Sequence, residues 1–181
     1  MDNLKQLIES KTIVVVDLET SGLDKNRDYI IEVGAVKIEE GKICDKFATL
    51  VYTPQMKCLP PEVESLTGIT YEQLKGAPLV EEVLQKLYKF AKDCTLVAHN
   101  LPFDFAFLRN WGFWCGVHFD EFEKDAIDTI DLAKQVLGDK VKNYKLATLA
   151  DYFNIEFNHH RALDYAEVTA KIFLELIKRT Y

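Results

Sequence analysis

Short apolar runs rich in β-branched residues mark the candidate strands of this chain. Residues 12–20, TIVVVDLET, form one such run, and residues 95–100, TLVAHN, form another that stops at a polar pair. Both runs are typical of buried strands. Residues 29–52, YIIEVGAVKIEEGKICDKFATLVY, predict two antiparallel strands joined by a turn at Glu40–Gly41.

The first strand of that hairpin shows a clear alternation. Ile31, Val33 and Ala35 lie on one face, whereas Glu32 and the small Gly34 lie on the other, because successive side chains of a strand point to opposite faces. The alternation supports a strand at this place.

Helical periodicity dominates most of the remaining chain. Apolar side chains recur in residues 78–94 at the spacing of one helix face. A further helix is predicted at 102–113, with Pro102 in its first turn. The other predicted elements are a proline-broken loop ending in a short helix at 54–70, a strand leading into a helix at 126–137, and helices at 146–153 and 162–180.

This order of elements predicts an α/β fold. A mixed β-sheet would carry the antiparallel hairpin at one side and flanking helices on its faces. We expect a single domain spanning residues 1–181, in which residues 1–11 form a leader.

Composition narrows the class of protein. The 181 residues are 48% hydrophobic and 28% charged, so a sizeable core is expected. The net charge of −7 argues against a protein that coats nucleic acid by bulk electrostatic attraction. It does not exclude a nuclease, because an active site built from carboxylates is acidic until its cations bind.

The chain also lacks the usual signals of membrane insertion and export. No apolar run approaches the roughly 18–20 residues that a membrane span needs, and the N-terminal stretch carries no signal-peptide segment. The four cysteines are scattered without metal-ligand spacing, which is typical of reduced thiols. We therefore expect a cytoplasmic protein with no membrane partner.

Two acids, Asp17 and Glu19, stand at the end of the first predicted strand. Residues two apart on a strand share a face, so the two carboxylates repel each other and lose hydration. A hard divalent cation would remove both costs. The alternative is a pair of solvated acids that open a turn at Ser21–Gly22.

A third acid, Asp104, lies in the first turns of a predicted helix, just after the strand that ends at His99–Asn100. Its sequence neighbours are apolar and aromatic, and an uncompensated acid is not expected to enter an apolar core. The alternative is an N-terminal aspartate that interacts favourably with the helix dipole. For His99 we favour a hydrogen-bonding role at the strand end.

The last group of polar residues lies in HHRALDYAEVTA, residues 159–170. His159 and His160 precede a helix that also presents Asp164, and a histidine placed beside an acid is a suitable general base. The alternative is two surface histidines and an exposed aspartate.

Together, in this order, the three groups resemble the three motifs of the DEDD superfamily of 3′→5′ exonucleases, in its histidine-containing subclass. The resemblance runs from about residue 12 to 178. Within the superfamily it is strongest to the proofreading exonucleases of bacterial DNA polymerase III, both the epsilon subunit and the PolC-type domain. The segments that carry it are VVVDLETSGLDKNRDYIIEVGAVKI, LPPEVESLTGIT, LVAHNLPFDFAFL, AIDTIDLAKQVL, YKLATLADYFNI and HHRALDYAEVTAKIF.

The resemblance implies an RNase H-like fold in which Asp17, Glu19 and Asp104 bind two divalent cations, Mg²⁺ or Mn²⁺, and His160 is the general base. The implied substrate is a single-stranded or frayed DNA 3′ end, and the implied product is a nucleoside 5′-monophosphate. The implied partner is a DNA polymerase subunit or domain. The residues expected to contact the terminal nucleotide are Thr20, Leu23 and Phe103, the last of which could equally be a core residue.

The chain departs from the family pattern at position 165. The family places four residues between the histidine and the last aspartate, so with His160 as the base the fourth carboxylate belongs where Tyr165 stands. A tyrosine, with a pKa near 10, binds hard cations poorly at neutral pH.

Three hypotheses about this position stay open. In the first, Asp164 supplies the metal ligand after a local shift, and either His159 or His160 is the base. In the second, Asp164 points away, because one step on a helix is about 100°, and the site is weakened. In the third, Tyr165 is an introduced substitution for a natural aspartate.

Two further features bear on the site. Asp128 resembles a recurrent family position and is expected to support the site rather than bind metal. Lys140, Lys142, Lys145 and Arg161 form a basic group that could meet a phosphate backbone, or that could be a solvated helix surface.

The leading functional hypothesis is therefore a metal-dependent 3′→5′ DNA exonuclease of the proofreading type. An RNA-trimming exonuclease is a rival within the class. A rival from another class is a non-catalytic domain that binds 3′ ends or a polymerase partner.

Overall fold

A five-stranded mixed sheet runs through the centre of the computed structural model, which describes residues 11–156 and 161–180. Its strand order is β3-β2-β1-β4-β5. The central strand β1 pairs antiparallel with β2 and parallel with β4. The strands are β1 (Ile13–Thr20), β2 (Ile30–Glu39), β3 (Lys42–Leu50), β4 (Thr95–Ala98) and β5 (Ile127–Asp128).

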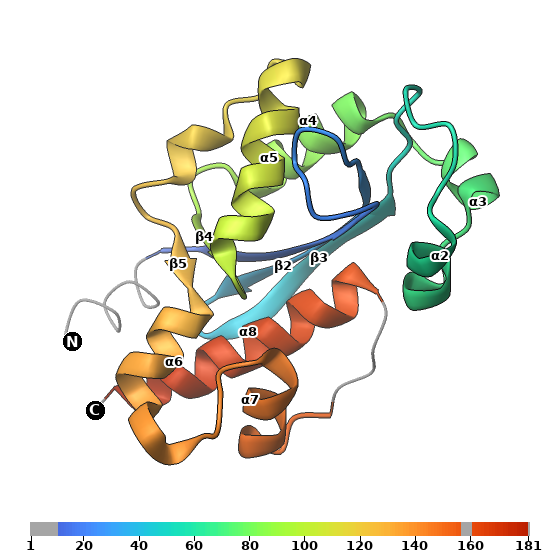
Figure 1. Cartoon of the computed structure of the whole chain (residues 1–181). Helices are drawn as coiled ribbons and strands as arrows, with labels where there is room; N and C mark the ends of the chain where they lie inside the picture. Colours follow the sequence, from blue (N-terminus) through green and yellow to red (C-terminus); the bar gives the residue numbers. More distant parts are fainter. Residues whose placement is uncertain (1–10, 157–160, 181) are drawn as a thin grey trace.

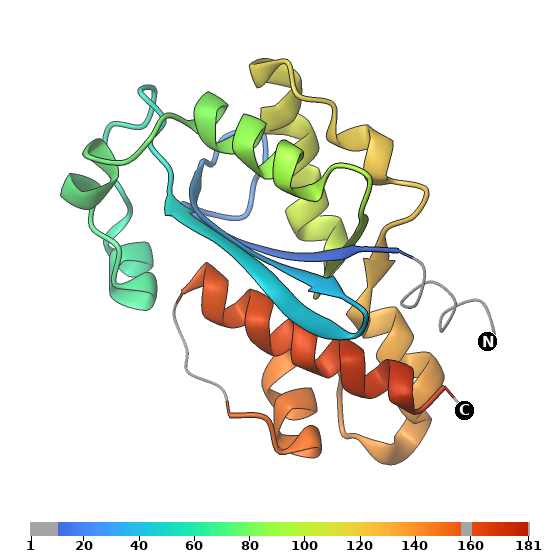
Figure 2. The same cartoon turned by 180° about the vertical axis from the view of Figure 1, so that it is seen from behind.

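Helices cover both faces of this sheet (Figures 1 and 2). The helices α4 and α5 pack on one face, and α6, α7 and α8 pack on the other. A smaller apolar cluster joins α2 and α3 to the side of the sheet. The helices are α2 (Pro61–Thr67), α3 (Tyr71–Lys75), α4 (Val80–Ala91), α5 (Leu101–Cys115), α6 (Thr129–Leu137), α7 (Leu146–Phe153) and α8 (Ala162–Lys178).

The alternation of β1 sorts its side chains between the two cores. Val14 and Val16 belong to the core beneath α4 and α5, whereas Ile13 belongs to the core beneath α8. Because side chains alternate along a strand, Asp17 and Glu19 continue the series that faces α8. The sequence thus directs both acids of the first motif towards the helix that carries the last one.

The α/β class and the antiparallel hairpin agree with the sequence-based expectation. The alternation of β2 did not indicate that both of its faces are buried: Glu32 is 1% exposed and Gly34 is also buried. Two 3₁₀ turns, at Phe119–Phe122 and Gly138–Lys140, were not expected from the sequence.

Three further expectations concerned the N-terminal leader, membrane-spanning segments and the cysteines. Most of the predicted leader, residues 1–10, lies outside the described residues. In the described part of the chain, no helix has both the length and the apolar character needed to cross a membrane. The four cysteines, Cys44, Cys58, Cys94 and Cys115, are free thiols.

Candidate active site

The acids of the first two motifs meet where β1 extends beyond its neighbour β4. The pairing between β1 and β4 covers only the residues from Ile13 to Val15 of β1. Farther along, the backbone N–H of Leu18 donates instead to Oδ1 of Asp104, at 3.0 Å. Asp104 is 4% exposed, and a buried N–H group needs such an acceptor. The bond brings the start of α5 against the strand that carries Asp17.

Burial and mutual repulsion make this group of acids hard to ionise. Burial raises the pKa of Asp17 well above its usual range, and the nearby charges of Asp104, Glu19 and Glu32 raise it further. The pKa of Glu19 rises to about 7 through burial and the charge of Glu32, with Arg161 opposing the change. Burial likewise raises the pKa of Asp104 to about 8, against the bond from Leu18. Such a group is stabilised by a cation.

The last motif presents a tyrosine to these acids. Tyr165 is half-buried on α8, and its ring packs against the core beneath that helix. Burial raises the pKa of its phenol, and the charges of Glu19 and Asp17 raise it further. The charge of Asp164 acts instead on Arg161. Tyr165 also lies on the same side of α8 as Ala162, whose backbone rests on Gly34 opposite Asp17. The side chain that α8 brings to the first motif is therefore that of position 165.

The predicted general base is not placed by the structure. His159 and His160 lie outside the described residues. Their role, and the choice between them, stay predictions from the motif.

Hydrogen bonds hold the start of α5 and the end of β4 in place. Asp128 caps α6 by accepting from the N–H of Ile130 at 2.8 Å, and its Oδ1 also accepts from the N–H of Asn100 at 3.1 Å. Asn100 has a φ of 66°, which costs free energy for a residue with a side chain. The sequence had suggested such a supporting role for Asp128.

His99 is part of the same strand end. Its Nδ1 lies 2.8 Å from Oγ1 of Thr129. Burial lowers the pKa of His99 to about 4, although Asp128 opposes the shift. The ring is therefore neutral near pH 7 and is a hydrogen-bonding partner, in agreement with the sequence-based interpretation.

The three residues expected to contact a nucleotide differ in their surroundings. The hydroxyl of Thr20 donates to the carbonyl of Gly22 at 2.6 Å. Leu23 is 86% exposed, so its side chain is accessible to a ligand. Phe103 is half-buried with its ring centroid 5.1 Å from that of Phe107, so it also packs on the core.

Glu32 is the residue of this site that no sequence motif indicated. It lies directly opposite Glu19 in the β1–β2 pairing and forms an ion pair with Arg161. Arg161, which the sequence suggested as one of a basic group for phosphates, is held by this acid instead. The feature of the sequence that could have drawn attention to Glu32 is an acid inside an otherwise apolar strand, although this feature does not show that the acid is buried.

The donor set of the site fits hard divalent cations. Buried carboxylates that repel one another, Asp17 and Asp104 with Glu19 beside them, are the oxygen ligands that Mg²⁺ and Mn²⁺ prefer. Within residues 11–156 and 161–180, no three His, Cys, Asp or Glu side chains are already spaced around one point for a cation. Position 165, where the family pattern has a carboxylate, offers a phenol.

These raised pKa values predict that stability falls as pH rises when cations are absent. Between about pH 4 and 8 the folded state holds protons on Glu19 and Asp104 that the unfolded chain has released. Their stabilisation is complete below the unfolded pKa values and is lost as pH rises through about 7 to 8. Each extra proton held changes the free energy of unfolding by about 1.4 kcal/mol per pH unit.

Urea unfolding in a chelator, from about pH 5.5 to about 8.5, measures this slope. The variant Asp104→Asn should flatten it. Adding Mg²⁺ should stabilise the protein more at the alkaline end, because cations bind the ionised acids. A free energy of unfolding that rises with pH over this interval, with no difference between the two proteins, would contradict the prediction.

Comparisons with known proteins identify the family to which this fold belongs. The sequence model of the Exonuclease family (RNase_T) matches residues 14–173. The chain therefore belongs to the exonuclease family.

Among the relatives of this chain are PolC-type DNA polymerases. The chain is 43% identical over 167 residues to the PolC-type DNA polymerase III of Caldanaerobacter subterraneus, covering 92% of this chain. It is 38% identical over 174 residues to the PolC-type DNA polymerase III of Bacillus subtilis, covering 96% of this chain. The chain spans 12% of the length of each of these relatives.

Solved structures share the fold. E. coli Exonuclease I, in complex with a dT13 oligonucleotide, has a TM-score of 0.83 at 15% identity over 94% of this chain and 42% of that one. The nuclease domain of 3′hExo, a DEDDh family member bound to rAMP, has a TM-score of 0.79 at 21% identity over 93% of this chain and 92% of that one. The RNase H-like fold of the DEDDh exonucleases, expected from the sequence motifs, is thus confirmed.

Proposed function

We propose that this chain is a metal-dependent 3′→5′ exonuclease that removes nucleoside 5′-monophosphates from single-stranded or frayed DNA 3′ ends, with turnover limited by Tyr165. The observation that carries the proposal is the group of buried acids at the end of β1. Asp17 and Asp104 come from distant parts of the sequence, and burial and repulsion raise the pKa of each. Acids kept in such surroundings mark a functional site.

In this mechanism, one group of residues would bind the cations and another residue would accept a proton. Asp17, Glu19 and Asp104 would bind two cations, Mg²⁺ or Mn²⁺. When bound, such a pair lowers the pKa of an attacking water and neutralises the charge that develops on the leaving 3′ oxygen. His160 would accept the proton of that water. Asp128 and the neutral His99 would keep the start of α5 in place.

Tyr165 is the feature that favours a second candidate function. With a phenol beside Asp17 and Glu19, the site would bind cations less tightly than one with four carboxylates. A domain of this kind would bind 3′ ends and cut them slowly or not at all. Turnover that depends on added metal separates the two functions.

The substrate and setting are part of the same proposal. The exposed Leu23, with Thr20 and Phe103, would contact the terminal nucleotide. Similarity to PolC-type polymerases supports DNA as the substrate, a polymerase subunit or domain as the partner, and a cytoplasmic location. We further propose that residues 1–181 make up one exonuclease domain. An RNA strand of the same sequence tests the RNA-trimming alternative.

Release of mononucleotide from a 3′-labelled single strand is the test of this function. We expect slow release with Mg²⁺ or Mn²⁺, none in a chelator, and a loss of about 100-fold in Glu19→Ala, because a ligand carboxylate contributes several kcal/mol of charge stabilisation. Glu82→Ala, on the exposed face of α4, is the matched control and should leave the rate unchanged. Release that persists in Glu19→Ala would contradict the assignment, and release without metal would overturn the proposal.

A further inference from the structure

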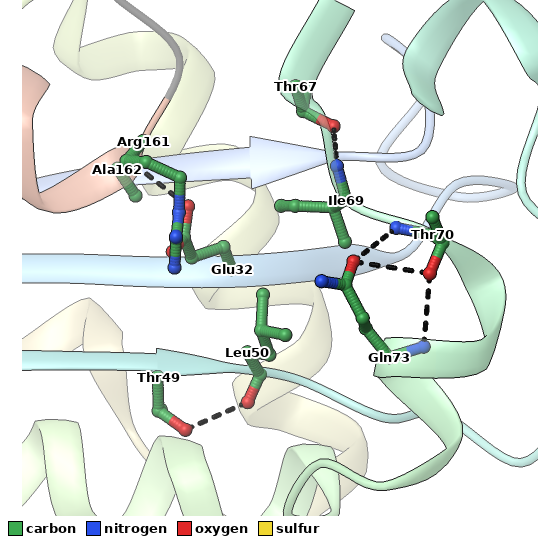
Figure 3. A network of polar contacts seen from close by, with 9 residues as sticks. All are labelled: Glu32, Thr49, Leu50, Thr67, Ile69, Thr70, Gln73, Arg161 and Ala162. Carbon is green, nitrogen blue, oxygen red and sulfur yellow. Dashed lines mark hydrogen bonds and ion pairs between the residues drawn. The ribbon is translucent and has the colours of Figure 1, made fainter. Parts of the chain in front are cut away.

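Glu32 is a buried acid near the start of β2, and both of its carboxylate oxygens accept hydrogen bonds from the residues where α8 begins. Oε1 accepts from Nε of Arg161 at 2.7 Å and also from Nη2 of the same guanidinium. Oε2 accepts from the backbone N–H of Ala162 at 2.9 Å. Figure 3 shows the carboxylate beside the guanidinium of Arg161, with a dashed line joining it to Ala162. Since both oxygens are occupied, Glu32 is better suited to hold the helix than to bind a cation.

The start of α8 needs such an acceptor. The first N–H groups of a helix have no partner within the helix. The residue before α8 is Arg161, whose side chain makes no capping bond and carries no acceptor atom. Glu32 therefore caps α8 from another element, and its negative charge interacts favourably with the helix N-terminus.

A second contact on the same face fixes the helix against the strand. Gly34 follows Glu32 by two residues, so both lie on the face of β2 that α8 covers. A Cβ at Gly34 would overlap the carbonyl carbon of Ala162 and the nitrogen of Leu163. Backbone thus rests on backbone here, which only a glycine allows. The cap and this contact together restrict both the distance of α8 from the sheet and the rotation of α8 about its own axis.

Rotation matters because consecutive helix positions differ by about 100°. With α8 held as observed, Tyr165 follows Ala162 by three residues and so lies on the same side of the helix, the side that rests on Gly34, which pairs with Asp17. Asp164, two residues after Ala162, does not share that side. A turn of α8 that brought Asp164 to the same place would break the bond from Ala162 to Glu32. The local shift considered from the sequence is therefore opposed by two contacts.

We propose that Glu32 is a positioning residue that sets the rotation of α8, so that position 165 rather than 164 faces Asp17 and Glu19. The inference rests on the proposed function of the site for its catalytic consequence. Its structural part, the capping of α8 by Glu32, stands independently of that function and has its own readout.

Hydrogen exchange of the α8 amides tests the structural part. In Glu32→Ala the amide of Ala162 should exchange about 5- to 150-fold faster, because losing the acceptor of a buried N–H costs about 1–3 kcal/mol. Glu32→Gln keeps the shape of the side chain and one acceptor oxygen, so this variant should fold and should show a smaller increase in the exchange rate of the Ala162 amide. Glu39→Ala removes an exposed acid from the other end of β2 and should leave this amide unchanged.

Metal affinity and turnover test the consequence, in the Tyr165→Asp variant as the reference protein. Adding Glu32→Ala or Glu32→Gln should weaken Mn²⁺ binding and lower kcat by about 10-fold or more, as for other residues that orient metal ligands. KM for the DNA strand should stay the same, because the residues expected to contact the nucleotide are untouched.

The outcomes separate this inference from the proposed function. Unchanged exchange at Ala162 in both Glu32 variants would overturn it, as would faster exchange with unchanged Mn²⁺ affinity. If the Tyr165→Asp protein does not cut DNA at all, the proposed function fails, while the exchange and Mn²⁺ measurements still decide the role of Glu32.

Discussion

Tyr165→Asp is expected to raise the rate of mononucleotide release in Mg²⁺ by about 100-fold. Position 165 is the one that α8 turns towards the first motif, because it lies on the same side of the helix as Ala162, which rests on Gly34 opposite Asp17. A carboxylate there would complete the set of acids, and about 3 kcal/mol of added charge stabilisation in the transition state corresponds to this factor. Single-turnover release from a 3′-labelled strand measures it.

Two variants separate ligand chemistry from the bulk of the ring. Tyr165→Asn has nearly the size of aspartate but no charge, so it should stay as slow as the parent. If Tyr165→Asn accelerates the reaction as much as Tyr165→Asp does, the tyrosine ring limits the rate by its bulk and not by the missing charge. Asp164→Asn in the parent should have little effect, whereas a large loss would identify Asp164 as the fourth ligand after all.

Gly34→Ala is expected to lower the free energy of unfolding by about 3 kcal/mol, a large effect for one methyl group. Its Cβ would overlap the backbone of Ala162 and Leu163, and backbone atoms cannot turn aside as a flexible side chain does. The start of α8 would have to move off β2. Urea denaturation measures the loss of stability, and the amide of Ala162 should lose protection in the same variant.

Gly76→Ala provides the matched control. Gly76 ends α3 with a φ of −89°, and the nearest atom to an added Cβ there is 3.6 Å away. Its free energy of unfolding should stay within about 0.5 kcal/mol of the parent. If Gly34→Ala is equally mild, α8 does not rest on the strand as closely as the structure shows.

The layers of the fold could be predicted from the sequence because the periodicity was strong. The β-branched run of β1 and the turn at Glu40–Gly41 have direct local signals, and both elements are where the pattern placed them. The burial of Glu32 had no such signal. Alternation placed it on the face opposite Ile31 and Val33, but a pattern of faces does not say that a helix from the far end of the chain covers that face.

The candidate site could be predicted only in part for a similar reason. Motif spacing indicated Asp17, Glu19 and Asp104, and the structure brings these acids close enough for their charges to interact. The choice between positions 164 and 165 depends on the rotation of α8, which long-range contacts to Glu32 and Gly34 determine. Spacing along the sequence carries no information about those contacts.

The pairing of Glu32 with α8 has a consequence for how the protein is made. A chain emerges from the ribosome N-terminus first, so β1, β2 and α5 are present long before Ala162 and the rest of α8. Until then Glu32 lacks the partners that bind its two oxygens, and the acids of β1 lack the side of the site that α8 supplies. A nascent chain interrupted before α8 would thus hold acids without an ordered site, and the activity proposed for this site would arise only when synthesis of this helix is complete.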